Sequence, residues 1–429
     1  MLYERWREIA GRHGNEMALH DIAARRRWTF AELNAASEAE DPAKGPVRFP
    51  SGISTDFILE VLRAWRSAKI VCPLEDPQSR PQFERFPAGC AHLKTTSATS
   101  GAPRVIAFTE TQLIADADNI VTTMRLRSDW PNLGVISLAH SYGFSNLVLP
   151  LLLHGIPLLL LNTNLPDAIR GASCHAERIT LPAVPALWRA WHDAGSIPSN
   201  VHLAISAGAP LSLPLELQVF EATGVKIHNF YGASECGGIA YDRTSIPRTD
   251  ATVVGSPMNN VEASLDENGC LMVRGKAVGE TYWPEPEPNL AGGVYRTSDL
   301  AELKDGLVSL RGRASDLINV AGRKIRPEAI EQTLLAHPLV SDCLVFGIPS
   351  EETDRTETIA VCVVSRAGAT IEALKEFLQS QLPAWQVPRE WAFTDSLPAN
   401  RRGKLARAEW RQWFLDRKAA RETGSSRCS

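Results

Sequence analysis

The feature that most constrains the fold is an alternation of apolar and amphipathic runs between residues 55 and 240. The runs 133–138, 156–161 and 201–206 are short and mainly apolar, whereas residues 185–193 have the spacing of an amphipathic helix. Strands that are buried on both faces have such continuous apolar runs, and the helices between them cover the sheet. The pattern therefore predicts an α/β fold with a largely buried sheet.

The pattern changes beyond residue 250. Residues 251–312 contain short apolar runs separated by turn signals, which predicts a β-rich subdomain. The remaining chain is predicted to form helix 327–337, strands 342–347 and 358–365, helix 370–381, strand 390–394 and a terminal helix, a compact α+β unit. Because 429 residues suit two domains better than one, we predict a large N-terminal domain, 1–314, and a small mobile C-terminal domain, 315–429.

Composition excludes several classes of protein. The net charge is −4, from 45 basic and 49 acidic residues, so neither nucleic acid nor an anionic membrane is an expected partner. The eight cysteines have no C-x-x-C spacing, which is typical of a reducing compartment. The most apolar stretch, 147–161, is interrupted by Pro150 and Pro157 and is expected to form a buried helix and strand. With no apolar signal-peptide region at the N-terminus, we expect a cytoplasmic protein without a membrane span.

A loop rich in hydroxyl groups is the first candidate site. Residues 95–104 read TTSATSGAPR and offer backbone N–H groups, side-chain donors and one cation, which together suit a triphosphate. Taken alone, the segment also fits a flexible Ser/Thr surface loop. The candidate phosphate-binding residues are Thr96, Ser97, Thr99, Ser100, Gly101 and Arg104.

The second candidate is the segment 231–235, which reads YGASE. Tyr231 followed by Gly232 can stack on a purine while the backbone comes close. Ser234 can donate to a phosphate oxygen, and Glu235 is the kind of hard oxygen ligand that Mg²⁺ prefers. A buried tyrosine at a turn beside a surface glutamate is the alternative interpretation.

Both segments resemble motifs of the AMP-forming acyl-CoA synthetase and adenylation-domain superfamily, which includes acyl-CoA ligases, peptide-synthetase adenylation domains and luciferase. Residues 96–104 are similar to T-S-G-[ST]-T-G-x-P-K, with Ala98, Ser100 and Arg104 departing from it, and residues 231–235 to Y-G-x-T-E. Only about 20 residues separate Leu74 from this loop, so the chain resembles a shortened member of the family.

Three further segments carry the resemblance toward the C-terminus: 295–300 (YRTSDL), 310–331 and 397–407 (LPANRRGKLAR). The resemblance implies that Asp299 binds the ribose hydroxyls and that Arg313 reaches the ribose and phosphates. It places Lys404 at the position of the catalytic lysine.

The same resemblance implies an interdomain hinge at Ser315 and a thiol-facing loop at Gly322. The segment 206–211 (SAGAPL) is similar to the S-G-G-A-P-L turn, which lines the adenine and acyl pockets and contains Gly208 and Ala209. The implied acyl-pocket residues are His140, Tyr142, Ser206, Ala207 and Gly237. Apart from the histidine they are small or neutral, which favours an apolar aryl or fatty acid over an amino acid; His140 also fits a core or interface histidine.

By resemblance, a carboxylate and MgATP give acyl-AMP and pyrophosphate, after which the small domain turns and admits a thiol. Coenzyme A is the expected acceptor. The phosphopantetheine arm of a separate acyl-carrier protein is the first alternative. A non-catalytic nucleotide-binding relative is the second, suggested by Ala98 and Ala207 where the family has glycine.

Overall fold

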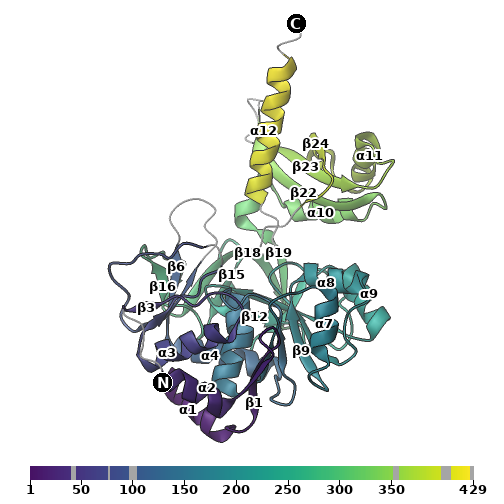
Figure 1. Cartoon of the computed structure of the whole chain (residues 1–429). Helices are drawn as coiled ribbons and strands as arrows, with labels where there is room; N and C mark the ends of the chain where they lie inside the picture. The colour runs from purple at the N-terminus through teal and green to yellow at the C-terminus, as the bar shows by residue number, and fades with distance from the viewer. Residues whose placement is uncertain (40–44, 76–77, 96–103, 351–356, 398–406, 426–429) are drawn as a thin grey trace. The chain divides into compact units, whose positions relative to one another are not determined.

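The computed structural model describes residues 1–39, 45–75, 78–95, 104–350, 357–397 and 407–425 (Figure 1). The fold is mixed α/β, as predicted. Two compact units are present. Unit 1 comprises Met1–Glu267, Leu271–Thr297 and Leu303–Ser309, and unit 2 comprises Asn268–Cys270, Ser298–Glu302 and Leu310–Ser429.

Unit 1 contains the parallel part of a large sheet. Its strands are mostly buried, apart from the end of β11, because the sheet has helices on both sides, with α1 to α4 grouped on one side in Figure 1 and α7 to α9 on the other. The neighbouring parallel strands are, in order, β1 (Met17–Asp21), β8 (Leu158–Leu160), β7 (Asn132–Gly134), β9 (Ile179–Ala183), β10 (Val201–Ser206) and β11 (Ile227–Ala233).

Two helices of unit 1 begin at residues that the local sequence favours. In α4 (Glu110–Met124), the Thr109 hydroxyl accepts from the Gln112 amide and the Gln112 side chain accepts from the Thr109 amide, a capping box. Proline begins α8 (Pro185–Asp193), the range predicted from the sequence. The other helices are α1 (Leu2–Arg12), α2 (Phe30–Ala39), α3 (Thr55–Arg66), α5 (Ser141–Gly143), the π-helix η1 (Phe144–Val148), α6 (Leu149–His154), α7 (Pro166–Ser173) and α9 (Leu213–Thr223).

The segment 147–161 folds as predicted, into helix and strand, and no helix in the described part of the chain is long and apolar enough to cross a membrane. The strand predicted at 133–138, however, ends at Gly134. The chain then turns back, and the Ser137 carbonyl oxygen lies only 2.0 Å from where a Cβ on Gly143 would be. That close approach requires glycine at position 143, and residues 135–140 form no strand.

A second sheet has the order β16 (Thr281–Trp283), β6 (Val105–Thr109), β5 (Cys90–Thr95), β4 (Ile70–Val71) and β3 (Val47–Arg48). Strands β5 and β6 are antiparallel and flank the phosphate-loop candidate, with Thr95 paired to Val105. The loop residues Thr96, Ser97, Thr99, Ser100 and Gly101 lie outside the described residues.

Antiparallel strands, most of them short, occupy the region predicted to be β-rich. Strand β12 (Gly237–Tyr241) pairs with β11 and with β13 (Val253–Pro257), which pairs with β19 (Leu307–Arg313). Beyond β19, the large sheet continues with β18 (Val294–Lys304), β15 (Cys270–Arg274) and β14 (Glu262–Leu265), and β17 (Leu290–Ala291) pairs with β18. At the opposite edge of the sheet, β2 (Arg26–Thr29) pairs with β1.

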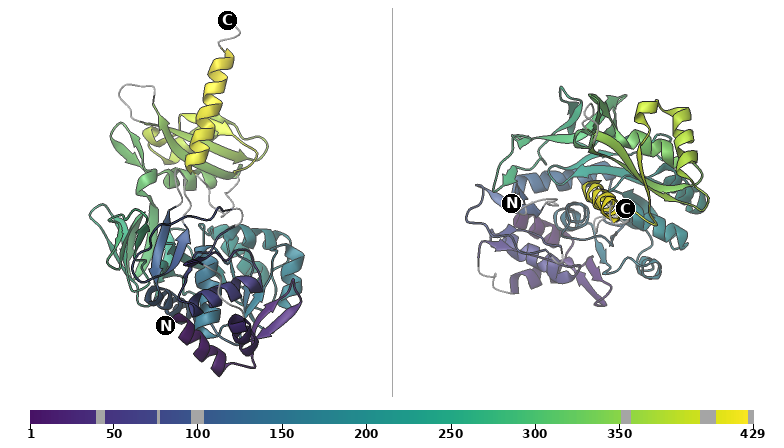
Figure 2. Two further views of the ribbon diagram at one scale, coloured as in Figure 1. Left: turned by 60° about the vertical axis from the view of Figure 1, so that its left-hand side comes forward. Right: turned by 90° about the horizontal axis from the view of Figure 1, so that it is seen from above.

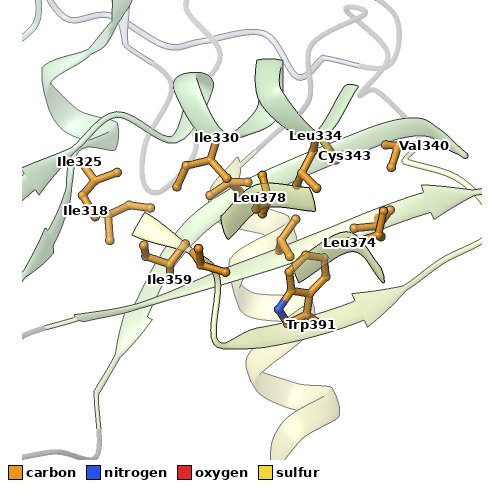
Figure 3. Close-up of a cluster of buried hydrophobic side chains, with 14 of the residues drawn as sticks. Ile318, Ile325, Ile330, Leu334, Val340, Cys343, Ile359, Leu374, Leu378 and Trp391 are labelled. Atoms are coloured by element: carbon orange, nitrogen blue, oxygen red, sulfur yellow. The ribbon is translucent and has the colours of Figure 1, made fainter. Parts of the chain in front are cut away.

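Unit 2 is built on a three-stranded sheet of β22 (Val340–Pro349), β23 (Glu357–Ser365) and β24 (Glu390–Phe393). Alternate residues of these strands belong to two different apolar clusters, as the two-residue period of a strand requires. Helices α10 (Pro327–Leu335) and α11 (Ile371–Gln381) cover one face, where Ile330, Leu334, Leu374 and Leu378 are buried (Figure 3).

The other face of this sheet is covered by α12 (Arg407–Ser425), whose Phe414 packs against Leu344, Phe346 and Ile348. Figure 2 shows this yellow helix crossing the green strands of the sheet. The hairpin of β20 (Ile318–Val320) and β21 (Arg323–Ile325) adds Ile318 and Ile325 to the first cluster. Burying each such side chain stabilises the unit by about 1.5–3 kcal/mol, so the elements predicted for 327–394 can form one core.

A buried histidine on β5 makes the stability of unit 1 depend on pH. His92 is 1% exposed, and its ring lies 4.4 Å from the Phe144 ring and 6.4 Å from the Phe108 ring. Burial, and then the positive charge of Lys94, lower the pKa of His92 well below its ordinary value. The folded chain therefore holds this ring neutral at pH values where the unfolded chain protonates it.

We expect His92→Phe to reduce the acid sensitivity of folding. Because the unfolded chain binds the proton more readily, the native histidine costs about 1.4 kcal/mol of stability for each pH unit below about 6.5, until the pH reaches its folded pKa. Urea unfolding of both proteins between pH 5 and 7 (about the range in which histidine titrates) measures the difference. The exposed His202→Gln is the control, and equal pH dependence of His92→Phe and the native chain would contradict the assignment.

Candidate active site

The β11–β12 hairpin presents the segment 231–235. Ala233 pairs with Gly237 and Gly232 with Gly238, so Glu235 lies in the tight connection between the strands. A Cβ on Gly232 would lie 2.6 Å from the Gly237 carbonyl oxygen, which explains why this position needs glycine. Tyr231, Ser234 and Glu235 are all partly exposed on this hairpin.

A buried ion pair lies behind the hairpin. A Cβ on Gly237 would lie 2.0 Å from Oδ1 of Asp116, and Gly237 has a φ of +69°, so both space and backbone require glycine. Oδ2 of Asp116 accepts from the Ser145 hydroxyl at 2.6 Å and lies 3.6 Å from the Lys94 ammonium. Both charged side chains are 3% exposed. The pair thus links β5, which leads to the phosphate loop, with α4 and the hairpin turn.

Glu235 has a partner that the sequence interpretation missed. The Tyr282 hydroxyl, on β16, donates to Oε1 of Glu235 at 2.9 Å, and Tyr282 is in turn hydrogen-bonded to Tyr295 on β18. Burial, followed by the nearby charge of Glu235, raises the pKa of both phenols. Both hydroxyls therefore keep their protons and act as donors at neutral pH.

Arg104, the cation that ends the phosphate loop, belongs to the same cluster. Its Cζ lies 4.3 Å from the centre of the Tyr282 ring, a cation–π distance, and its guanidinium lies 2.8 Å from Glu287. The structure thus brings together Arg104 and Glu235, which the sequence proposed separately, and Tyr282 is the residue between them. A tyrosine in a short predicted strand gives no sequence signal of this kind.

Asp299 and Arg313 are paired in unit 2. Nε of Arg313 lies 3.0 Å from Oδ1 of Asp299, and the arginine is half exposed while the carboxylate is 18% exposed. Strands β18 and β19 carry these two residues. A carboxylate and a guanidinium held side by side can bind adjacent hydroxyl and phosphate groups of one ligand.

The acyl-pocket candidates gather at the carboxyl ends of the parallel strands. Ser206, the last residue of β10, pairs with Ala183 at the end of β9 and is followed by the buried Ala207. The Tyr142 hydroxyl donates to the carbonyl oxygens of Ala183 and Ile205 at 3.5 and 3.4 Å. Ligands of open α/β sheets bind at this end of the strands.

Other candidates have definite places nearby in the chain. His140 is partly exposed, and its Nδ1 accepts from the Tyr142 amide at 3.2 Å, which begins helix α5. Gly208 follows β10 with a φ of +88°, and Ala209 is partly exposed. Gly208 and Ala209 thus follow Ser206 directly, whereas His140 lies at the start of α5, two residues before Tyr142.

The remaining candidates lie in unit 2. Ser315 is in the short 3-10 helix η2 (Ala314–Asp316), and its hydroxyl is 3.2 Å from Oδ1 of Asp316. Gly322 connects β20 and β21 with a φ of +81°, and its amide donates to the Asn319 side chain at 3.0 Å. Lys404 lies outside the described residues.

Comparisons with known proteins agree with this arrangement. The model of the AMP-binding enzyme family matches residues 62–286, and that of the AMP-binding enzyme C-terminal domain matches residues 329–404. Mitochondrial malonate–CoA ligase ACSF3 of Bos taurus is 26% identical over 82% of this chain and 69% of its own length. Oxalate–CoA ligase of Arabidopsis thaliana is 28% identical over 79% of this chain and 70% of its own.

Solved structures share the fold. ATP-bound MatB from Rhodopseudomonas palustris superposes with a TM-score of 0.84 at 20% identity, covering 97% of this chain and 99% of MatB. The o-succinylbenzoate CoA synthetase MenE from Bacillus subtilis, in complex with an acyl-adenylate, gives 0.81 at 20% identity, covering 95% and 97%. With the two family matches, which cover more than half of the sequence, these findings show that the chain belongs to the AMP-binding enzyme family and is an AMP-forming ligase.

Proposed function

We propose that this ligase activates a carboxylic acid with ATP and transfers the acyl group to the thiol of coenzyme A. The observation that carries the proposal is the cluster of Glu235, Tyr282 and Arg104 beside β5 and β6, the strands that flank the phosphate loop. Names of several relatives support the acceptor, since they are malonate–CoA, oxalate–CoA and feruloyl-CoA enzymes.

In the first half-reaction, a carboxylate oxygen attacks the α-phosphorus of ATP, the bond from that phosphorus to the bridging oxygen breaks, and pyrophosphate leaves. We propose that Arg104, the phosphate-loop hydroxyls and Lys404 stabilise the negative charge that develops on the phosphate oxygens during this step. Tyr231 stacks on the adenine, with Gly232, Gly208 and Ala209 allowing close approach, and Ser234 donates to a phosphate.

Asp299 and Arg313 provide the ribose contacts in this proposal. Their 3.0 Å pairing supports it, because the guanidinium already orients the carboxylate that would accept hydrogen bonds from the ribose hydroxyls. In the second half-reaction the sulfur of the thiolate attacks the acyl carbon, and the bond to the adenylate oxygen breaks to release AMP. We place this step after a turn of a small domain that begins at Ser315, with Gly322 on the thiol side.

We further propose that Mg²⁺ enters with ATP. Such a metal commonly takes one or two carboxylates together with substrate phosphates, so a single glutamate suffices. Glu235 fits: with Oε1 held by Tyr282, its Oε2 makes no hydrogen bond or ion pair with the described residues. The bound ion would neutralise charge that develops on the phosphate oxygens.

For the acid, we propose an apolar acyl group bound against Tyr142, Ser206, Ala207 and Gly237, with His140 at the entrance.

We propose a cytoplasmic location from the cysteines, since all seven in the described residues are free thiols. Burial raises the pKa of three of them to about 11 or 12.

A phosphopantetheine thiol on a carrier protein is the second candidate acceptor. It is supported by two relatives that are not named as CoA enzymes, the 2,3-dihydroxybenzoate–AMP ligase of Bacillus subtilis and triostin synthetase I of Streptomyces triostinicus. Thioester formation with coenzyme A, compared with a panel of holo-carrier proteins, separates the two acceptors.

Glu235→Gln should lower carboxylate-dependent pyrophosphate exchange by at least about tenfold at saturating Mg²⁺, or about 1.4 kcal/mol in the barrier. The amide keeps the shape of the side chain and can still accept from Tyr282, but it removes the charge that would bind the metal. Glu262→Gln, on the exposed face of β14, is the matched control. Exchange within about threefold of the native chain would refute the metal-ligand role. Absence of exchange in the native chain with a broad panel of acids would instead favour a non-catalytic relative.

A further inference from the structure

We propose that Tyr282 is a positioning residue that fixes the Glu235 carboxylate for the metal on ATP and sets the place of Arg104. The inference rests on the proposed metal-ligand role of Glu235. It follows from one side chain making two contacts: its hydroxyl donates to Glu235 at 2.9 Å, and the face of its ring lies 4.3 Å from the Arg104 guanidinium carbon.

The backbone around Tyr282 is hydrogen-bonded to the segments that carry its two partners, Glu235 and Arg104. Strand β16 pairs antiparallel with β6, with Tyr282 opposite Ile106 and Trp283 opposite Val105, the residue after Arg104. On the other side, the Gly279 amide donates to the carbonyl oxygen of Glu235 at 2.8 Å. The segment 279–283 therefore contacts Glu235 through both backbone and side chain.

Close packing keeps this segment in place. A Cβ on Gly279 would lie 2.8 Å from Ile106, 3.1 Å from the Phe108 ring and 3.1 Å from the Glu235 carbonyl oxygen. Tyr295, on β18, is hydrogen-bonded to the Tyr282 hydroxyl. The hydroxyl that donates to Glu235 thus has a second contact that orients it.

This arrangement prepares the carboxylate before ATP arrives. A free glutamate side chain has three rotatable bonds, and ordering it on binding would weaken the affinity for the metal–ATP complex. The Tyr282 hydroxyl holds Oε1 in advance and leaves Oε2 for the metal. The Tyr282 ring separately holds Arg104, so the two contacts can be removed one at a time.

The test measures ATP binding by isothermal titration calorimetry, with and without Mg²⁺, in the absence of the acid. Tyr282→Phe keeps the ring and removes the hydroxyl. We expect it to reduce the Mg²⁺-dependent gain in ATP affinity by about tenfold and to leave metal-free ATP binding within about twofold. Tyr282→Leu also removes the ring under Arg104, and should weaken metal-free binding as well.

The matched control is Tyr3→Phe, which also removes a tyrosine hydroxyl that donates to a glutamate, here Glu38 at 3.2 Å, outside this cluster. It should leave both affinities unchanged. If Tyr282→Phe does not fold, Tyr295→Phe removes only the hydroxyl behind Tyr282, and a loss of about threefold in the Mg²⁺-dependent gain is expected.

Two failures are distinguishable. If Glu235→Gln abolishes the Mg²⁺-dependent gain in ATP affinity but Tyr282→Phe retains this gain in full, Tyr282 does not position the carboxylate. That result overturns the inference. If Glu235→Gln itself retains the gain, the metal-ligand role of Glu235 falls, independently of Tyr282. An unchanged metal-free affinity in Tyr282→Leu would overturn the part of the inference that concerns Arg104.

Discussion

Arg407→Met should lower the free energy of unfolding of unit 2 by about 3–5 kcal/mol. Its guanidinium lies 3.2 Å from Asp316, 2.9 Å from Glu328 and 2.5 Å from Glu331, and it also donates to the Val345 carbonyl oxygen. The arginine is only 18% exposed. Removing it leaves three carboxylates close together in a partly buried place, where their mutual repulsion and lost hydrogen bonds both oppose folding.

Hydrogen exchange of the α10 and β22 amides in the full-length protein measures this effect directly. Arg411→Met is the matched control, because Arg411 is on the same helix but 42% exposed and 3.7 Å from Glu357, where an ion pair contributes about 0–1 kcal/mol. Adding Glu331→Gln to Arg407→Met should recover part of the loss, since it removes one repelling charge. A loss below about 1 kcal/mol in Arg407→Met would mean that the carboxylates are solvated.

The elements that could be predicted from the sequence are those with strong local signals. Pro185 marks the start of α8, and the periodic patterns of α10, α11, β23 and β24 predicted these elements to within two residues at each end. The strand predicted at 133–138 was too long, because the approach of Ser137 to Gly143 depends on packing and not on the residues of the strand. Local pattern sets the type of an element, whereas packing sets where it ends.

The contacts around the candidate site connect residues that are far apart in sequence. Glu235 and Tyr282 are 47 positions apart in the sequence. The same holds in unit 2 away from the site, where Arg407 and Asp316 are 91 positions apart. No periodic pattern relates such residues, so the single sequence could nominate Glu235 but not its partner. The buried pair of Lys94 and Asp116 was missed for the same reason, although a lysine in an apolar strand is an unusual residue that points to a charged partner.

Ser315→Pro should separate the two half-reactions. Ser315 lies in η2 between β19 and β20, and its neighbour Asp316 is held by Arg407 at 3.2 Å. Hinges are a few residues at the ends of such elements that absorb changes in φ and ψ. This prediction depends on our proposed domain boundary at Ser315.

Proline fixes φ near −65° and disfavours helical ψ in the preceding residue, here Ala314, so the variant should favour one domain arrangement without touching a ligand-binding group. We expect the rate of adenylation, measured by pyrophosphate exchange, to stay within about tenfold of the native rate. Single-turnover thioester formation from isolated acyl-AMP should fall by about a hundredfold, which corresponds to about 2.7 kcal/mol in the barrier. Ser315→Ala removes the same hydroxyl but keeps backbone freedom, and should perform both steps like the native chain. If Ser315→Pro also performs both, the domains do not turn about Ser315, and the hinge must lie elsewhere or the alternation be abandoned.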